Sequence, residues 1–261
     1  MDSINQSKWF VCSKKRLSAK MRLFCLPYAG GNASTYLPWE ESLPEFVKLI
    51  AIQPPGRANR ICEAKYTSMY SLVTDMYQAI EPYLDKPYVI FGHSVGSRVG
   101  FELVRSIKQN GKLMPIHFFA SGSRAPNICG ATKKIYNLPE SEFIKELMSF
   151  NGTPKELFKN RELLSLLIPL LRADFQISED YQFTGDECLK CDLSIFSGES
   201  DDSISESELI EWKRFFNGRN SSEVFQGGHF FIQQDRDSVV RKISTTLNNI
   251  LLHTMGHNIS M

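Results

Sequence analysis

The sequence has no excess of charge of either sign. Its 30 lysine and arginine residues are balanced by 29 aspartate and glutamate residues, which leaves a formal net charge of +1 over 261 residues. A chain without a basic or acidic surplus has no general electrostatic attraction to nucleic acids or to membrane surfaces. We therefore expect no nucleic acid and no membrane as a partner, and any charged partner would have to meet a local patch.

Long apolar runs are missing as well. No segment approaches the roughly 20 apolar residues that a membrane-spanning helix needs. The first 20 residues are basic, but their apolar stretch, residues 9–12, is too short for the core of a signal peptide. These features predict a soluble, cytoplasmic protein, which we expect to be a monomer.

Internal repeats, low-complexity tracts and proline- or serine-rich linkers are also absent. With 42% hydrophobic residues, a chain of this length can bury a full core. The composition therefore predicts one large domain, or one domain with an insertion.

The six cysteines form no pattern that is typical of a metal site. Cys188 and Cys191 have the spacing of a zinc or redox pair, but there is no second cysteine pair and no suitably spaced histidine pair nearby. His253 and His257 are four residues apart but flank a glycine near the C-terminus. We expect no metal, and we expect the cysteines of a cytoplasmic protein to stay reduced.

One pentapeptide, Gly92-His93-Ser94-Val95-Gly96, stands between two different patterns. Before it, residues 88–91 form a short β-rich apolar run, which is typical of a strand buried on both faces. After it, apolar residues recur every fourth position, as on a helix packed against a sheet. A serine at such a strand-to-helix turn is strained and exposed, and can act as a nucleophile. The alternative is a chance Gly-x-Ser-x-Gly string.

Further apolar runs at residues 21–27, 47–52, 117–121, 193–196 and 223–226 predict more strands, and Thr67 is a plausible N-cap of a helix between them. Alternating strands and helices predict an α/β fold with a parallel sheet, which binds ligands at the carboxyl ends of its strands. After Pro126 the alternation stops for about 60 residues, and helical patterns rich in leucine and phenylalanine take over. We interpret this insertion as a lid that lines an acyl pocket; the alternative is that its helices belong to the core.

An acid and a histidine follow Ser94 in the chain order Ser, Asp, His, each just after a strand-like run. His229 is suited to take the serine proton, because histidine titrates near neutrality. His93 is its nearest rival, but neighbouring side chains diverge at a sharp turn, so we interpret His93 as a packing residue. His117 begins a strand and is most simply structural.

Asp201 could orient the histidine from the loop after residues 193–196, and Asp202 and Glu199 are alternatives in the same loop. The loop after residues 21–27 contains Gly30 and Gly31 but lacks the lysine and Ser/Thr of a phosphate-binding loop. In a hydrolase such a loop supplies one oxyanion N–H, and the residue after the nucleophile supplies the other. These donors would be Ala29 and Val95.

Seven motifs in order resemble those of the type II thioesterases, the free-standing α/β-hydrolases that serve nonribosomal peptide and polyketide synthases and have fatty-acid-releasing relatives in animals. The motifs are Leu26-Pro27-Tyr28-Ala29-Gly30-Gly31, Pro55-Gly56-Arg57, Gly92-His93-Ser94-Val95-Gly96, Phe101-Glu102-Leu103, Ser121-Gly122-Ser123-Arg124-Ala125-Pro126, Leu171-Arg172-Ala173-Asp174 and Gly227-Gly228-His229-Phe230-Phe231. The likeness covers residues 21 to about 252. It implies a nucleophile at Ser94, a base at His229, oxyanion donors at Ala29 and Val95, and no cofactor.

The family's acid lies in a Gly-x-x-Asp-Pro pattern, which residues 198–202 match except that Asp202 replaces the proline. The resemblance favours Asp201 but leaves the choice between the two aspartates open. It also divides the chain into an N-terminal extension (1–20), an α/β-hydrolase core (21–126 and 188–261) and a helical lid (127–187).

The resemblance implies that the protein hydrolyses acyl or aminoacyl thioesters on the phosphopantetheine arm of carrier proteins. The alternatives are a fatty-acyl-releasing thioesterase, an acyltransferase or carboxylesterase on the same fold, and a binding protein without turnover. Carrier domains are usually acidic, so basic residues near the site could dock one, although each could equally be solvated surface. These candidates are Arg57, Arg60, Arg124, Lys133 and Lys134.

Overall fold

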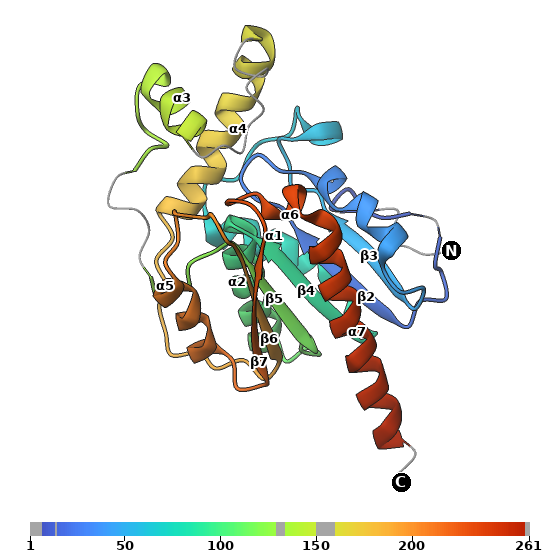
Figure 1. Ribbon diagram of the computed structural model, residues 1–261. Helices are drawn as coiled ribbons and strands as arrows, with labels where there is room; N and C mark the ends of the chain where they lie inside the picture. Colours follow the sequence, from blue (N-terminus) through green and yellow to red (C-terminus); the bar gives the residue numbers. More distant parts are fainter. Residues whose placement is uncertain (1–6, 14, 129–133, 150–159, 259–261) are drawn as a thin grey trace.

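A computed structural model describes residues 7–13, 15–128, 134–149 and 160–258 (Figure 1). Its centre is a seven-stranded sheet with the strand order β1-β3-β2-β4-β5-β6-β7. The strands are β1 (Phe10–Val11), β2 (Met21–Leu26), β3 (Val47–Ile52), β4 (Tyr88–His93), β5 (His117–Ser121), β6 (Asp192–Gly198) and β7 (Asn220–Phe225). The α/β-hydrolase fold that the sequence predicts is therefore present.

All neighbouring strands from β3 to β7 run parallel, and only the edge strand β1 is antiparallel. Every residue of β2, β3, β4 and β5 is buried, which explains why these strands appear in the sequence as unbroken apolar runs. The order of the strands reverses direction between β2 and β4, the position where parallel sheets open a crevice at their carboxyl ends. The predicted nucleophile and the predicted oxyanion loop follow these two strands.

The helices are α1 (Met69–Ile80), α2 (Val95–Gln109), α3 (Glu140–Ser149), α4 (Arg161–Glu179), α5 (Glu206–Ile210), α6 (Phe231–Gln234) and α7 (Arg236–Asn258). Short 3₁₀ segments are η2 (Ala33–Thr35), η3 (Leu37–Ser42), η4 (Ala58–Arg60), η5 (Glu81–Tyr83) and η7 (Glu211–Phe215). The first helix begins one residue later than predicted, because Ser68 and not Thr67 is its N-cap residue.

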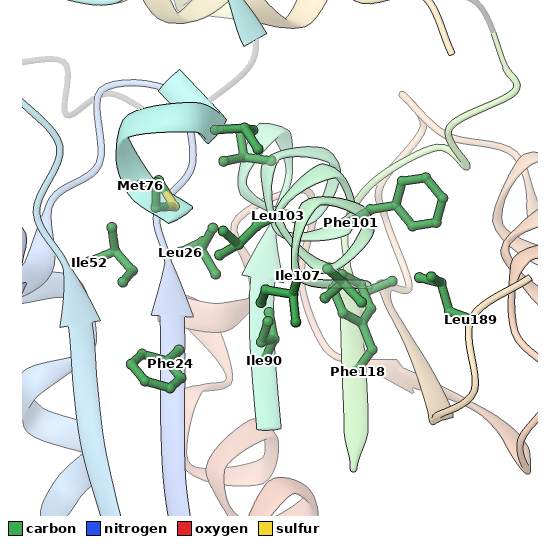
Figure 2. Packing of buried hydrophobic residues seen from close by; sticks show 14 of the residues in the cluster. Phe24, Leu26, Ile52, Met76, Ile90, Phe101, Leu103, Ile107, Phe118 and Leu189 are labelled. Atoms are coloured by element: carbon green, nitrogen blue, oxygen red, sulfur yellow. The ribbon is translucent and has the colours of Figure 1, made fainter. Parts of the chain in front are cut away.

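The core has two parts, one on each face of the sheet. Alternate residues of each strand join different clusters, as the two-residue period of a strand requires: Ile90 packs with α1 and α2, whereas Phe91 packs with α7. Figure 2 shows the first cluster, in which Leu103 of α2 lies beside Leu26 of β2, and Ile107 of α2 lies beside Ile90 of β4. This packing holds α2 against β2 and β4.

Helices α3 and α4 have a third apolar cluster of their own, and both project away from the sheet in Figure 1. The cluster contains Ile135, Phe143, Leu147, Leu164, Ile168 and Leu171. Helix α4 runs through Pro169, because apolar packing on both sides of the proline offsets the one lost backbone hydrogen bond. Part of the predicted lid, residues 129–133 and 150–159, lies outside the described residues.

Three absences hold for the described part of the chain. No helix there combines the length and the apolar character that crossing a bilayer demands. The described cysteines, Cys12, Cys25, Cys62, Cys188 and Cys191, are all free thiols. No cluster of three or more histidine, cysteine or acidic side chains in those ranges could hold a metal ion.

His117 is buried inside the sheet, where its Nε2 lies 2.8 Å from the hydroxyl of Ser194 on the neighbouring strand. Burial lowers the pKa of His117 to about 4, because the charged imidazolium would lose its hydration. The side chain is therefore neutral and structural at physiological pH, as its place at the start of a strand predicts.

This burial generates a test of acid stability. An unfolded histidine titrates near pH 6.5, so between about pH 6.5 and pH 4 the unfolded chain binds a proton that the folded chain does not, and the free energy of unfolding falls as the pH falls. The loss assigned to His117 is on the order of 3 kcal/mol at pH 4. Urea unfolding at pH 7 and pH 4.5 should show a smaller acid-induced loss in His117→Gln than in the wild type. The exposed His253 provides the control, and equal losses in His117→Gln and His253→Gln would contradict the assignment.

Candidate active site

The turn between β4 and α2 holds Ser94 in a left-handed backbone conformation, with φ 55° and ψ −125°. Such a conformation is strained in any residue other than glycine, and it survives because the surrounding packing leaves no alternative. The two glycines of the pentapeptide permit this packing. A Cβ on Gly92 would lie 2.4 Å from the carbonyl oxygen of Gly96, and one on Gly96 would lie 2.5 Å from the carbonyl oxygen of Leu26.

Three predicted residues meet at this turn. The hydroxyl of Ser94 lies 3.0 Å from Nε2 of His229, and Nδ1 of the same ring lies 2.8 Å from Oδ2 of Asp201. Each follows the end of a parallel strand, β4 for the serine, β6 for the aspartate and β7 for the histidine. These strand ends share one edge of the sheet. The topology therefore brings Ser94 and His229 together, although they are 135 residues apart in the sequence.

The carboxyl group of Asp201 is 5% exposed and is held on both oxygens. Oδ2 faces His229, while Oδ1 accepts hydrogen bonds from the backbone N–H of Ser203 at 3.1 Å and from its hydroxyl at 2.5 Å. Burial opposes ionisation of this group, but the hydrogen bond and charge of His229, with the Ser203 bonds, outweigh it and lower the pKa of Asp201. The aspartate is therefore ionised at neutral pH and can fix the tautomer of the imidazole.

The rival acids point to solvent instead. Asp202 and Glu199 are both exposed, and neither contacts the imidazole of His229 among the interactions of the described residues. Of the neighbouring carboxylates that the sequence leaves open, Asp201 is the one that lies against the imidazole of His229.

His93 is fully buried behind the site and does not contact the serine hydroxyl. Its Nδ1 lies 2.9 Å from the hydroxyl of Ser121, and its ring centroid lies 5.3 Å from that of His229. Burial, and then the neighbouring His229, hold the pKa of His93 well below its usual range. It is a neutral packing partner of the second imidazole, in agreement with the sequence interpretation.

Two backbone N–H groups, which follow the ends of β2 and β4, make no hydrogen bond to an acceptor outside their own helix or turn in the described part of the chain. Val95 is the first residue of α2, so its N–H has no partner within the helix. Ala29 lies in a tight turn closed by a 2.9 Å hydrogen bond from the N–H of Gly31 to the carbonyl of Tyr28, and its own N–H makes no hydrogen bond within the described ranges. Unpaired N–H groups near a nucleophile are suited to stabilising an oxyanion.

Two of the predicted carrier-docking residues are not on the surface, and the prediction is wrong for both. Arg57 and Arg60 are each 6% exposed, because their guanidinium groups donate to backbone carbonyls and to Asp174 and Glu63 within the fold. Arg124 and Lys134 are partly exposed and are paired with Glu208 and Asp180. Lys133 lies outside the described residues.

Asp174 on α4 belongs to the motif Leu171-Arg172-Ala173-Asp174, but the sequence alone indicates no partner for it. The structure pairs Asp174 with Arg57 at 2.8 Å and places both beside the Ala29 turn. A charged residue in an otherwise apolar helical segment is the signal that could have drawn attention to it. Its partner could not be read from the sequence, because the two residues are separated by 117 positions.

Two cavities are lined by described residues near α2. A small one is lined by Leu26, Val95 and Val99 together with Arg57 and Asp174, next to the turn that holds Ser94. A groove of about 640 Å³ lies between α1, α2 and the end of α4, and none of Ser94, Asp201 and His229 lines it.

Residues 21–247 match the family described as the thioesterase domain. This match covers most of the chain and contains every residue of the arrangement described above. The chain belongs to the thioesterase family. The resemblance inferred from the seven sequence motifs is thereby confirmed.

Among relatives of this thioesterase, the linear gramicidin dehydrogenase LgrE of Brevibacillus parabrevis is 36% identical over 256 residues, which are 97% of each chain. Among solved structures, ClbQ from the colibactin NRPS/PKS pathway is similar with a TM-score of 0.85 and 32% identity, covering 90% of this chain and 99% of that one. YbtT, a type II thioesterase from the yersiniabactin NRPS/PKS pathway, has a TM-score of 0.80 and 28% identity, covering 90% and 96%.

The two adjacent aspartates of this thioesterase provide a matched test. Asp201→Asn keeps the shape of the side chain but removes the charge that fixes the histidine tautomer, so kcat for thioester hydrolysis should fall by about 10⁴-fold. Asp202→Asn should leave kcat within about twofold of the wild type, because this exposed side chain has no contact with His229. Steady-state kinetics on an acyl-pantetheine substrate would measure both, and a larger loss in Asp202→Asn would contradict the assignment.

Proposed function

We propose that this protein is a type II thioesterase that hydrolyses acyl or aminoacyl thioesters from the phosphopantetheine arm of carrier proteins. The observation that carries the proposal is the hydrogen-bonded series from Ser94 through His229 to Asp201. The backbone N–H groups of Ala29 and Val95, which lack a partner among the described residues, add to it. Membership of the thioesterase family supports the class of bond that is cleaved. The type II thioesterase YbtT, which shares the fold over most of both chains, supports the class of substrate.

The first half of the proposed reaction transfers the acyl group to the enzyme. His229 takes the proton of Ser94 as its oxygen attacks the thioester carbonyl carbon, and the new C–O bond places negative charge on the carbonyl oxygen. The N–H groups of Ala29 and Val95 stabilise this oxyanion, and Asp201 stabilises the imidazolium. When the C–S bond breaks, the thiol leaves with the proton from His229 and an acyl-Ser94 ester remains.

The second half of the reaction releases the acid. His229 deprotonates a water molecule that attacks the acyl-serine, and the returning proton restores the Ser94 hydroxyl. Thioesters place the smallest demand on the acid step, because a thiol has a pKa of about 8.5 and its thiolate is a good leaving group. The arrangement therefore suits a thioester without excluding oxygen esters.

The remaining parts of the proposal concern the partner and the place of action. We propose that the protein works as a monomer in the cytoplasm on acylated carrier domains, with α3 and α4 as the lid over the acyl group. Their separate apolar cluster and the contact of α4 with the Ala29 turn support this role for the two helices. The word dehydrogenase in the name of LgrE describes LgrE and is not carried over to this chain. The geometry of this chain supports acyl transfer to water.

The nucleophile provides the direct test. Purified wild-type protein should release free acid from an acyl-carrier protein, and Ser94→Ala should lower kcat by about 10⁶-fold, because it removes the only oxygen positioned to attack within the hydrogen-bonded series. The matched control is Ser106→Ala on the same helix, which should retain wild-type turnover. Mass spectrometry of the acyl-enzyme and the product would follow both halves of the reaction.

The same experiment separates the alternatives. Acyl transfer to an added alcohol or amine in preference to water would favour an acyltransferase, and efficient turnover of simple oxygen esters without carrier thioesters would favour a carboxylesterase. Failure of a fluorophosphonate probe to label Ser94 in the folded wild-type protein would contradict catalysis and favour a binding protein.

A further inference from the structure

Two sequence motifs without a part in the proposed chemistry meet in the structure. Arg57, in the loop after β3, forms an ion pair with Asp174 on α4 at 2.8 Å between Nη2 and Oδ1. Both side chains are only 8% exposed. A buried ion pair is weak evidence for stability, since desolvation of the two charges offsets much of their attraction. The presence of this buried pair therefore needs an explanation other than stability.

The remaining atoms of the pair hold the turn that contains Ala29. Oδ2 of Asp174 accepts a hydrogen bond from the backbone N–H of Gly30 at 2.7 Å. Nη1 of Arg57 donates to the backbone carbonyl of Gly31 at 2.9 Å. The two residues that directly follow Ala29 are thus held by one charged group each, and each hydrogen bond is strengthened by that charge.

This turn would have more than one orientation without such support. Its closing bond joins the N–H of Gly31 to the carbonyl of Tyr28, and Gly30 has φ +75°, the left-handed value expected of the third residue of a type II turn. Glycine-containing turns can rotate their central peptide while keeping the closing bond, because the type I and type II forms share it. The bond from Gly30 to Asp174 selects one orientation of the peptide between Ala29 and Gly30, with its N–H toward Asp174 and the Ala29 carbonyl on the other side, and so anchors the chain directly after Ala29.

Helix α4 is pressed against the same turn. Leu171 lies one helical turn before Asp174, and its side chain occupies the space beside Gly30, where a Cβ would come within 2.6 Å of it. Arg57 is itself fixed by Gln53, whose side chain donates to the Arg57 carbonyl at 3.0 Å and accepts from the N–H of Ala33 at 2.9 Å. The ion pair therefore joins three segments: the Ala29 turn, the loop after β3 and α4.

We propose that Arg57 and Asp174 are positioning residues, which anchor the turn at Gly30 and Gly31 and thereby hold the N–H of Ala29 in place for the oxyanion formed at Ser94. This inference rests on the proposed function, because it deepens the role of the same site. Through this pair, the placement of α4 on the core sets the geometry of an oxyanion donor. Neither residue touches the reacting atoms.

The decisive experiment replaces the ion pair by apolar residues of similar volume. In Arg57→Met with Asp174→Leu, no charge is left unpaired, so the fold should be retained, as is often found for buried pairs. The turn nevertheless loses both anchors. We expect kcat to fall by about 10- to 1,000-fold, up to the full loss of one oxyanion donor, while KM stays within about threefold of the wild type.

Two readouts and one control variant distinguish positioning from a purely structural role. Titration with a fluorophosphonate counts folded, reactive sites, so that kcat is expressed per competent serine. The affinity of a trifluoromethyl ketone, whose tetrahedral adduct places an oxyanion at the same donors, should fall in parallel with kcat/KM. The control variant Asp180→Asn changes an exposed carboxylate at the end of the same helix, which pairs with Lys134, and should behave as the wild type.

A second variant keeps the test decisive if the double variant does not fold. Arg57→Lys retains the charge beside Asp174, but its single ammonium cannot also reach the Gly31 carbonyl as the guanidinium fork does. It should fold and show a fall in kcat at unchanged KM in the same direction.

The outcomes separate this inference from the proposed function. A folded double variant with wild-type kcat per titrated site would overturn the positioning role, as would a lower kcat with unchanged affinity for the trifluoromethyl ketone. A loss confined to the number of titratable sites would show that the pair is only structural. Wild-type protein that neither labels nor hydrolyses would instead overturn the proposed function itself.

Discussion

The close crossing of β2, β4 and α2 is the constraint on which the site depends. Gly96 lies under the carbonyl groups at the end of β2, so near that no side chain fits between them. This approach forces the chain to turn within one residue, and Ser94 takes the strain of the turn. The result is a hydroxyl raised above the strand ends and a helix whose first N–H groups point to the same place. The proposed nucleophile and one proposed oxyanion donor thus arise from one backbone feature.

Burial and hydrogen bonding together determine which side chains of the site are charged and which are neutral. Asp201 is ionised although it is almost covered, because His229 and Ser203 hold both of its oxygens. His93 lies against His229 but stays neutral, since it is buried without an acidic partner at its ring. One ionised carboxylate therefore faces the imidazole that also contacts Ser94.

The segments outside the parallel core also bear on the site. The N-terminal extension adds β1 to the edge of the sheet, and the carbonyl of Trp9 accepts a hydrogen bond from the N–H of Gln53 at 2.8 Å. Arg16 in the same extension donates to four backbone carbonyls between Glu40 and Val47. On the other side, α4 reaches the Ala29 turn through Asp174. Peripheral segments therefore support the loops after β2 and β3 from two directions.

Local patterns in the sequence determined the strands, the strand-to-helix turn at Ser94 and the identity of His229, because buried parallel strands and a glycine-bounded serine leave signals within a few residues. The sequence does not predict the edge strand β1, because its two residues are too few to show a periodic pattern. Only the tertiary structure placed Asp201, and not its neighbours, against His229, buried the arginines expected at the surface, and paired Arg57 with Asp174. These outcomes depend on which strand ends, loops and helix faces meet in space, across 28 residues for Asp201 and His229 and 117 residues for Arg57 and Asp174, and such contacts leave no pattern in a single sequence.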